Sequence, residues 1–417
     1  MFKIAIIGTG ISGLAAAHVL HRVHDIEVFE AQEYIGGHTN TVVVDDGGRS
    51  LAVDTGFIVY NTTTYPNLMR LFDELGVPTQ ESNMSFSLSC RETGFEYGNS
   101  LLSSLKARPR NLVSRDFLRM VYDHLRFSRD VQRDVDDPSY ANARLGEYIR
   151  EKKYSSSFVR YMLTPMASAI WSSPRRAIHD FPAQYLFHFY INHGLLQGSQ
   201  PVYWRTVSGG SHVYVKKLVQ PFRHKIHLNC AVRAVRRHEA HVSLILEDGT
   251  EKVYDHVVIA THSDQALRLL ADPSPEEQAI LGQIAYQRNT AVLHTDESVL
   301  PRHPAAWASW NYTLYAGQDA DNPTSLTYWM NSLQKLDTNT NYCVTINPNH
   351  INPDRIIKTI TYEHPVYSLQ SLAAQKRLPQ INGTRRTHYC GAYCGYGFHE
   401  DGMNAGLAVA QQLGASW

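Results

Sequence analysis

Apolar runs and a glycine-rich turn alternate over the first thirty residues. The continuous apolar run Ile4 to Ile7 predicts a buried strand, residues 14–20 predict an apolar helix, and Ile26 to Phe29 predict a second strand that ends on Glu30. Between the first strand and the helix stands Gly-Thr-Gly-Ile-Ser-Gly, residues 8–13. This order of strand, glycine turn, helix, strand and acid predicts a dinucleotide-binding unit.

The residue types in this unit suit the chemistry of a bound pyrophosphate. Gly8 permits a tight turn, Gly10 lets backbone N–H groups approach the phosphates, and Gly13 lets the helix pack closely on the strand. The helix N-terminus carries about half a positive charge toward the phosphates. Glu30 can accept hydrogen bonds from ribose hydroxyls. We therefore expect cofactor contacts from Gly8, Gly10, Ile11, Ser12, Gly13, Glu30 and Ala31.

The rest of the chain predicts a nucleotide-binding domain that is interrupted twice. Residues 65–190 are mainly helical in pattern, α/β character returns near residue 207, and residues 387–413 predict a strand, a glycine-rich loop and a closing helix. The predicted fold class is α/β, with a discontinuous Rossmann-like domain and an inserted α+β substrate domain. The expected domain pieces are 1–62, 205–268 and 385–417 for the nucleotide, with substrate pieces 63–204 (helical) and 269–384 (sheet).

Composition excludes several classes of protein. The 39 basic and 39 acidic residues balance, so we expect no nucleic-acid partner. No apolar run reaches the roughly 20 residues that a bilayer span requires. The 5 cysteines form no Cys-x-x-Cys motif, which favours a cytoplasmic protein with reduced thiols, and the 21 histidines show no metal-binding spacing, so no metal is expected.

Two basic stretches allow two interpretations. Phe117 to Val131 is amphipathic with interspersed arginines, and Lys106 to Arg110 predicts a basic loop. Either stretch is a solvated surface or a surface that faces a membrane.

Three further segments specify the type of dinucleotide. They are the glycine pair Gly36-Gly37, the string Asp54-Thr55-Gly56-Phe57, and the C-terminal segment from Gly391 to Gly406. In this order, and over nearly the whole chain, they resemble the flavin amine oxidase and phytoene desaturase superfamily. The resemblance implies an amine-oxidase-like fold that binds FAD noncovalently, with a final helix directed at the flavin. It implies cofactor contacts at Gly36, Gly37, His38, Thr39, Asp54, Thr55, Gly56, Phe57, Val232, Thr261, Gly391, Gly402 and Met403.

A narrower resemblance concerns three longer strings. Residues 286–296, Trp307 to Tyr312, and Gly395 to Gly402 are similar to bacterial flavoproteins associated with cyclopropane and methyl-branched fatty acid synthesis, and to the N-terminal flavin region of plant cyclopropane fatty acid synthases. This branch includes desaturases of methyl-branched acyl chains. The resemblance therefore implies an acyl-lipid substrate, peripheral contact with the inner membrane face, and a lipid methyltransferase as partner.

The sequence departs from amine oxidases at the presumed reaction centre. The residue three positions before Gly402, where amine oxidases place an aromatic cage residue, is His399. His399 is the candidate acid or base, and its alternative is a hydrogen-bonding role. Glu400 and Asp401 open a helix, where acids favour capping. The lysine that relatives hold beside the flavin has no clear counterpart, and Arg288 and His294 are candidates for its neighbourhood. The expected substrate-pocket residues, each with core packing as its alternative, are Trp171, Tyr393, Tyr396 and Phe398.

These observations predict an FAD-dependent oxidoreductase that acts on an unsaturated or methyl-branched fatty acyl chain. Three alternatives stay open: a flavin amine oxidase, a fatty acid isomerase, and a non-catalytic partner that presents lipid to a methyltransferase. No second Gly-x-Gly-x-x-Gly motif occurs. Oxygen, a quinone or another protein would therefore reoxidise the flavin.

Overall fold

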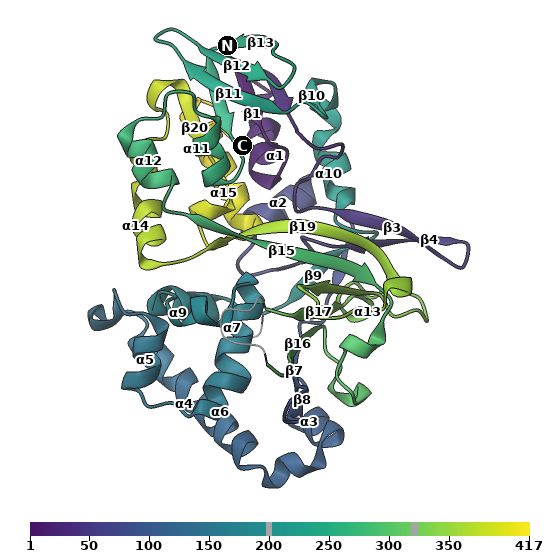
Figure 1. Ribbon diagram of the computed structural model, residues 1–417. Coiled ribbons are helices and arrows are strands. Elements are labelled where there is room, and N and C mark those ends of the chain that lie inside the picture. The colour runs from purple at the N-terminus through teal and green to yellow at the C-terminus, as the bar shows by residue number, and fades with distance from the viewer. Residues whose placement is uncertain (197–201, 318–323) are drawn as a thin grey trace.

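The computed structural model describes residues 1–196, 202–317 and 324–417 (Figure 1). A five-stranded parallel sheet with strand order β10-β2-β1-β14-β20 forms one end of the molecule. Its strands are β1 (Lys3–Ile7), β2 (Asp25–Phe29), β10 (Ile226–His227), β14 (His256–Ile259) and β20 (Thr387–Tyr389). Three distant stretches of the chain thus build one sheet, which confirms the α/β fold class. The expected residue boundaries of the domain pieces stay a prediction.

Two helices pack side by side against this sheet. Helix α1 (Ile11–Leu20) follows β1 directly, and α15 (His399–Gln412) follows β20 after a loop. A Cβ atom at Gly406 of α15 would overlap the backbone oxygen of Ser12, and one at Gly402 would lie 2.8 Å from the Ser12 hydroxyl oxygen. The two helices therefore touch through backbone, and both N-termini open at the carboxyl end of the parallel strands.

Smaller elements surround the parallel sheet. A three-stranded antiparallel sheet consists of β11 (Val232–Arg237), β12 (Val242–Leu246) and β13 (Glu251–Tyr254). The helices near this end are α2 (Pro66–Glu74), α10 (His212–Val219), α11 (Ser263–Leu269), α12 (Pro275–Leu281) and α14 (Leu369–Arg377). Five short strands form two further sheets: β3 (Thr41–Asp46) with β4 (Arg49–Asp54), and β5 (Val59–Asn61), β9 (Trp204–Val207) and β6 (Thr79–Glu81).

A seven-stranded mixed sheet crosses the middle of the molecule (Figure 1). Its strand order is β19-β15-β18-β17-β16-β7-β8, and the long antiparallel pair β15 (Ala285–His294) and β19 (Ile356–Val366) lies nearest the flavin-binding end expected from the sequence. The other strands are β7 (Phe86–Cys90), β8 (Glu96–Tyr97), β16 (Trp310–Leu314), β17 (Leu326–Trp329) and β18 (Cys343–Ile346). The short helix α13 (Met330–Leu333) follows β17 directly.

The far end of the molecule is helical (Figure 1). Its elements are α3 (Leu101–Ala107), the 3-10 helix η1 (Pro109–Val113), α4 (Arg115–Asp134), α5 (Leu145–Glu151), α6 (Ser156–Phe158), α7 (Thr164–Trp171), α8 (Arg175–His179) and α9 (Ala183–Asn192). Its core is aromatic, with Phe127, Tyr148, Phe158 and Phe187 almost fully buried. Within the ranges described above, no helix is both long and apolar enough to cross a membrane.

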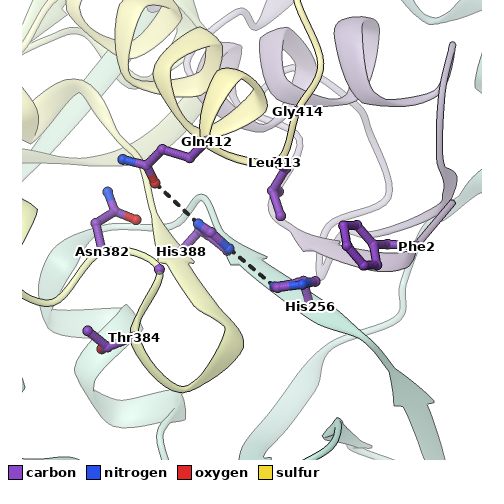
Figure 2. Close-up of a pocket in the computed structure, with 9 residues that line it drawn as sticks. Phe2, His256, Asn382, Thr384, His388, Gln412, Leu413 and Gly414 are labelled. Carbon is purple, nitrogen blue, oxygen red and sulfur yellow. Dashed lines mark hydrogen bonds between the residues drawn. The ribbon is translucent and has the colours of Figure 1, made fainter.

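A cavity of about 620 Å³ opens at the amino ends of β14 and β20, beside the C-terminus of α15. Figure 2 shows His388 between His256 and Gln412, with Phe2 at one side of the cavity. Ligands of open parallel sheets bind beyond the carboxyl ends of the strands. This cavity therefore lies at the wrong edge of the sheet for a dinucleotide.

Candidate functional site

The glycine turn after β1 leaves no room for side chains where the chain folds back. Gly8 has a φ of +103°, and a Cβ there would lie 2.9 Å from the backbone oxygen of Ala260. A Cβ at Gly13 would overlap the backbone oxygen of Gly8. At Gly10, in contrast, a Cβ would meet nothing within 4 Å. Gly10 therefore faces open space at the N-terminus of α1.

The N-terminus of α1 is suited to an anion. No side chain caps the helix at Gly10, and its first turn contains no acidic residue. The first N–H groups of a helix have no partner within the helix and carry partial positive charge. A phosphate group would satisfy both requirements. This uncapped turn, together with the open space at Gly10, fits the pyrophosphate of a dinucleotide.

Glu30 is held at the carboxyl end of β2, next to this turn. Its carboxylate accepts hydrogen bonds from the Thr9 backbone N–H at 3.0 Å, the Thr9 hydroxyl at 2.5 Å and the Gln32 backbone N–H at 3.0 Å. The Cys230 N–H donates to the Glu30 backbone oxygen at 2.8 Å, which brings the start of β11, including Val232, to the same place. These donors occupy Oε2 twice and Oε1 once, so Oε1 keeps one acceptor position, and the ribose contact expected from the spacing stays a prediction.

The second glycine pair folds onto the first turn. Gly36 and Gly37 have φ values of +132° and +59°, and a Cβ at Gly37 would lie 3.1 Å from the Gly10 Cα. The Gly36 N–H donates to the Thr9 hydroxyl at 3.3 Å. Two glycine segments that are separated in sequence thus meet at one point. Ala31, beyond Glu30, is exposed.

Asp54 is a buried structural carboxylate. It accepts hydrogen bonds from the Ser211 backbone N–H at 2.9 Å, the Ser211 hydroxyl at 2.8 Å, the Thr41 hydroxyl at 2.5 Å and the Gln334 amide at 2.8 Å. Burial raises the pKa of Asp54 to about 6. Because these donors occupy both carboxylate oxygens, Asp54 ties β4 to the turn before α10 and offers no free oxygen to a cofactor.

The residues after Asp54 continue the same wall. The Thr55 hydroxyl donates to the backbone oxygen of Asn40 at 2.8 Å, and the Phe57 N–H donates to the backbone oxygen of His38 at 2.7 Å. A Cβ at Gly56 would overlap the His38 backbone oxygen. Backbone contacts thus bring the two predicted strings of residues, 36–39 and 54–57, against each other.

His399 lies at the start of α15, with its ring buried among these residues. Its Nε2 lies 3.0 Å from the Thr39 hydroxyl and 2.9 Å from the Tyr214 hydroxyl, and the ring stacks on Phe57 with centroids 3.6 Å apart. Burial lowers the pKa of His399 to about 3. A general base works best with a pKa near the operating pH. The geometry therefore favours a neutral, hydrogen-bonding His399, and its acid–base role stays a prediction.

The two acids that follow His399 act on backbone N–H groups. Glu400 accepts hydrogen bonds from the N–H groups of Asn67 and Leu68, both at 2.9 Å, so it caps the first turn of α2. Asp401 accepts from the Phe398 N–H at 2.9 Å, and burial raises its pKa to about 6. Met403 packs in the core under α1. The expected capping is thus present, although Glu400 caps a different helix from its own.

Three of the four expected substrate-pocket residues belong to one aromatic cluster. We use this name for Trp171, Tyr185, Phe189, Tyr396 and Phe398. Tyr396 stacks on Tyr185 with centroids 4.3 Å apart, and Phe398 stacks on Phe189 at 5.1 Å. The Trp171 indole donates to the Tyr396 backbone oxygen at 3.1 Å. Phe398 packs against both the core of α1 and α15 and the core of the helical end, so the cluster lies where the two meet.

Tyr393, the fourth expected pocket residue, lies apart from this cluster. It is 2% exposed and packs with Tyr389 in the core beneath the parallel sheet. Its ring lies where a Cβ of Gly391 would be, and the same Cβ would lie 3.4 Å from the Thr261 backbone oxygen. Tyr393 therefore supports the Gly391 turn from below rather than facing the helical end.

The loop that carries Tyr396 and Phe398 is held by one carbonyl group. The Gly395 backbone oxygen accepts hydrogen bonds from the Tyr185 hydroxyl at 2.7 Å, the Gln375 amide at 2.7 Å and the Tyr367 hydroxyl at 2.9 Å. These donors come from α9, α14 and the end of β19. Three separate segments thus fix this loop.

Three histidines lie together near the glycine pair, and the spacing of residues in the sequence did not predict this group. The ring of His38 lies 6.3 Å from that of His262 and 5.5 Å from that of His364, and Glu363 lies 3.5 Å from His262. Burial lowers the pKa of all three histidines. Across the part of the chain with described coordinates, no group of His, Cys, Asp or Glu could hold a metal ion. The one sequence signal that could have indicated this group is the polar stretch around Glu363, which lies within a long strand.

Arg288 and His294 both lie on β15 but are far apart along it. Arg288 is exposed and lies 3.7 Å from Glu363, beside the histidine group. His294 is buried and lies 2.7 Å from the Thr345 hydroxyl. It is six residues beyond Arg288 on the same strand, roughly 20 Å along it. Only Arg288 therefore lies near the expected flavin neighbourhood.

Known proteins share this organisation. The model of a family described as flavin containing amine oxidoreductase matches residues 11–354. AofH of Mycobacterium tuberculosis, assigned by name as a flavin-containing monoamine oxidase, is 25% identical over 338 residues, which cover 76% of this chain and 67% of AofH. Canine amine oxidase [flavin-containing] A is 39% identical over 93 residues, 20% of this chain and 16% of that protein.

Solved structures match along the entire fold. A fatty acid isomerase from P. acnes that produces CLA covers 99% of this chain and 98% of its own, with a TM-score of 0.67 and 15% identity. Cyclohexylamine oxidase from Brevibacterium oxydans covers 99% of both chains, with a TM-score of 0.68 and 15% identity. Noncovalent attachment of the flavin stays a prediction. The chain belongs to the flavin-containing amine oxidoreductase family and is an FAD-dependent oxidoreductase.

Proposed function

We propose that this oxidoreductase dehydrogenates an unsaturated or methyl-branched fatty acyl chain. The observation that carries the proposal is the aromatic cluster at the junction of the flavin-binding and helical ends. Its rings pack on one another, with Tyr185, Tyr396 and Phe398 half-buried, and the carboxylate closest in sequence, Asp401, is bound to the Phe398 backbone N–H. Apolar side chains of this kind suit a hydrocarbon chain, because they bury its surface.

The position of His399 supports the same substrate class. In amine oxidases an aromatic residue at this place completes a cage for the amine, by the resemblance described above. Here the side chain is a histidine whose Nε2 is held by Thr39 and Tyr214, with its ring against Phe57. Half of the cage is therefore absent.

The chemistry divides between cofactor and protein. FAD, when bound, accepts a hydride, and the second hydrogen of the C–C bond leaves as a proton. The aromatic cluster would orient the acyl chain and exclude water. The N-terminus of α15, which packs beside α1 and whose Phe398 N–H is bound by Asp401, would direct the positive end of its helix dipole toward the site.

Relatives support two substrate classes. The P. acnes fatty acid isomerase, whose name specifies a fatty acid, shares the fold over 99% of this chain. AofH and cyclohexylamine oxidase, whose names specify amines, support amine oxidation as the second candidate. The departure at His399 supports the acyl chain as the first candidate.

The test is anaerobic mixing of the purified holoenzyme with extracted lipids that carry monounsaturated, methylated or cyclopropane chains. We expect the visible absorbance of oxidised flavin to disappear and the lipid to lose two hydrogen atoms by mass. Cyclohexylamine and putrescine form the comparison arm. Bleaching by amines alone would contradict the proposal, and a lipid product of unchanged mass would identify an isomerase.

A matched pair of variants connects the test to the aromatic cluster. Phe189→Leu removes the ring that stacks on Phe398, and we expect flavin reduction by lipid to slow about tenfold because the substrate is held less well. Flavin content should not change. Tyr203→Leu, at an aromatic side chain that is 70% exposed, is the control and should reduce flavin at the normal rate.

A further inference from the structure

Exposed apolar side chains are concentrated in one stretch of the helical end. In the residues with described coordinates, sixteen large apolar side chains are exposed, and eight of them lie between residues 101 and 125. Val113 is 82% exposed and Leu102 is 64% exposed. The eight, which together define the α3–α4 surface, are Leu101, Leu102, Leu112, Val113, Leu118, Val121, Tyr122 and Leu125.

Helix α4 contributes a second apolar stripe, in addition to the one that it packs into the core. Its buried residues include Phe117, Met120 and Phe127. Leu118, Val121, Tyr122 and Leu125 recur at helical spacing on the opposite, exposed side. A surface helix normally has one apolar stripe and a polar outer face. Each of these four side chains is at least 36% exposed in the described structure.

The same surface carries a strong excess of positive charge. Between Leu101 and Arg129 the sequence contains seven Lys or Arg residues and two Asp residues, a net charge of 7 − 2 = +5. The whole chain, in comparison, has a formal net charge of 0. Asp123 is 0% exposed and forms ion pairs with Arg119 and Arg126, so its charge is neutralised locally.

Several of these cations have no ion-pair partner. Among the described residues, no ion pair involves Lys106, Arg110, Arg115 or Arg129, and all four are exposed. Arg115 and Arg129 lie on α4 beside the stripe, and Lys106 and Arg110 border the short connection between α3 and η1. Unpaired cations beside exposed apolar side chains are complementary to anionic lipid headgroups above an acyl layer.

We propose that the α3–α4 surface docks this enzyme peripherally on an anionic phospholipid membrane. The apolar stripe enters the headgroup and acyl boundary, and the unpaired cations contact lipid phosphates. Figure 1 places α3 and α4 at the end of the molecule opposite the parallel sheet, so the flavin-binding end points away from the bilayer. The docking is independent of the proposed acyl substrate, because its readout is binding and not turnover.

The test is co-sedimentation of the full-length holoenzyme with vesicles of equal parts phosphatidylglycerol and phosphatidylethanolamine. Vesicles of phosphatidylcholine alone provide the uncharged comparison. We expect binding to the anionic vesicles, weaker binding to the neutral ones, and release as salt screens the charges. Hydrogen exchange should slow in residues 101–125 when anionic vesicles are present.

Two double variants divide the surface into its components. Leu112→Glu with Val113→Glu should weaken binding at least tenfold on both vesicle types. Arg110→Gln with Arg129→Gln should weaken binding to anionic vesicles about fivefold per cation removed and leave binding to neutral vesicles unchanged. All substituted side chains are exposed, so the flavin spectrum and circular dichroism should match those of the wild type.

Matched controls lie outside the surface. Ile356→Glu with Ile357→Glu changes two exposed isoleucines on β19, and Lys358→Gln with Lys376→Gln removes two exposed cations; neither should alter binding. The proposal is overturned if the wild type stays in solution with anionic vesicles, or if the surface and control variants bind equally. It is also overturned if the wild type is a dimer that Leu112→Glu with Val113→Glu separates, since the surface would then belong to a second copy.

Discussion

The flavin-binding end and the helical end of this enzyme are held together by different means. Around the parallel sheet, segments meet where side chains are missing, as at Gly13 against Gly8 and Gly406 against Ser12. In the helical end, segments meet through large rings such as Phe127 and Phe187. The cofactor region therefore depends on backbone approach, and the substrate region depends on side-chain packing.

The largest effect should come from adding a side chain where backbones touch. Gly406→Val would press a side chain into the Ser12 carbonyl group between α1 and α15. We expect a loss of about 5 kcal/mol or more in the free energy of unfolding and no flavin in the purified protein. Absorbance and denaturant unfolding measure both. Normal flavin content in this variant would refute the backbone-contact description.

The contrasting glycine is Gly10, where a Cβ would meet no protein atom within 4 Å. Gly10→Ala should therefore fold with nearly unchanged stability of the flavin-free form and bind FAD about tenfold or more weakly, because the methyl group enters the space before α1. Titration with FAD measures this. A destabilised fold with normal FAD affinity would contradict the assigned role.

The corresponding change in the helical end removes a ring. Phe187 is 0% exposed and packs against Tyr148 with centroids 4.7 Å apart. Phe187→Ala should cost about 3–5 kcal/mol of stability, yet the protein should purify with its flavin. The exposed Tyr122→Ala is its control, with a change below about 0.5 kcal/mol. If Phe187→Ala lost its flavin even at low temperature, flavin binding would also depend on side-chain packing in the helical end.

Two neighbours at the junction should respond to pH in opposite directions. His399 has a pKa lowered to about 3, so the unfolded chain binds more protons than the native one between pH 6.5 and 3, and stability falls as pH falls. Asp401 has a pKa raised to about 6, so its contribution weakens as pH rises from about 4 to 6.

Urea unfolding at pH 7 and pH 5, with excess FAD, separates these contributions. A difference of one bound proton changes the free energy of unfolding by about 1.4 kcal/mol per pH unit. Between pH 7 and pH 5, His399→Asn should therefore reduce the loss of stability on acidification by about 2 kcal/mol. Asp401→Asn should increase that loss. The same pH dependence in both variants and the wild type would mean that neither group is buried as described.

The smallest effect concerns the carbonyl group of Gly395. Tyr185→Phe removes one of its three donors and leaves Gln375 and Tyr367 in place, so we expect a loss of about 1 kcal/mol or less. Tyr203→Phe, on a 70% exposed side chain, is the control. A loss as large as that of Phe187→Ala would mean that a single hydrogen bond joins the two ends.

The sequence predicted most of the flavin-binding end because backbone requirements leave a local pattern. Gly8, Gly10 and Gly13 lie within six residues, and Glu30 follows at a fixed distance along the same βαβ unit. The α/β class, the family and the cofactor followed from such segments. The helix expected at Phe117 to Val131 extends to Arg115–Asp134, because the Ser114 hydroxyl accepts a hydrogen bond from the Phe117 N–H and caps its start.

Side-chain roles that depend on distant partners could not be predicted. Asp54 is bound by Gln334, 280 residues away, and Glu400 caps a helix 333 residues before it. The basic loop expected at Lys106 to Arg110 contains the end of α3 and the start of η1, with only Arg108 between them. For Asp54 and Glu400 the deciding contact joins segments that share no local pattern.

The order of strands in the parallel sheet also constrains how the newly made chain folds. Strand β1 lies between β2 and β14, and its pairing joins Ile4 to His256. At about 5–20 residues per second, a ribosome needs roughly 13–50 s to make the intervening residues. During that interval the edge of β1 is unpaired while the whole helical end has already emerged. Among the described strands, β1 thus has the longest stretch of chain before its second neighbour is made, and it is the strand on which a chaperone has the longest time to act.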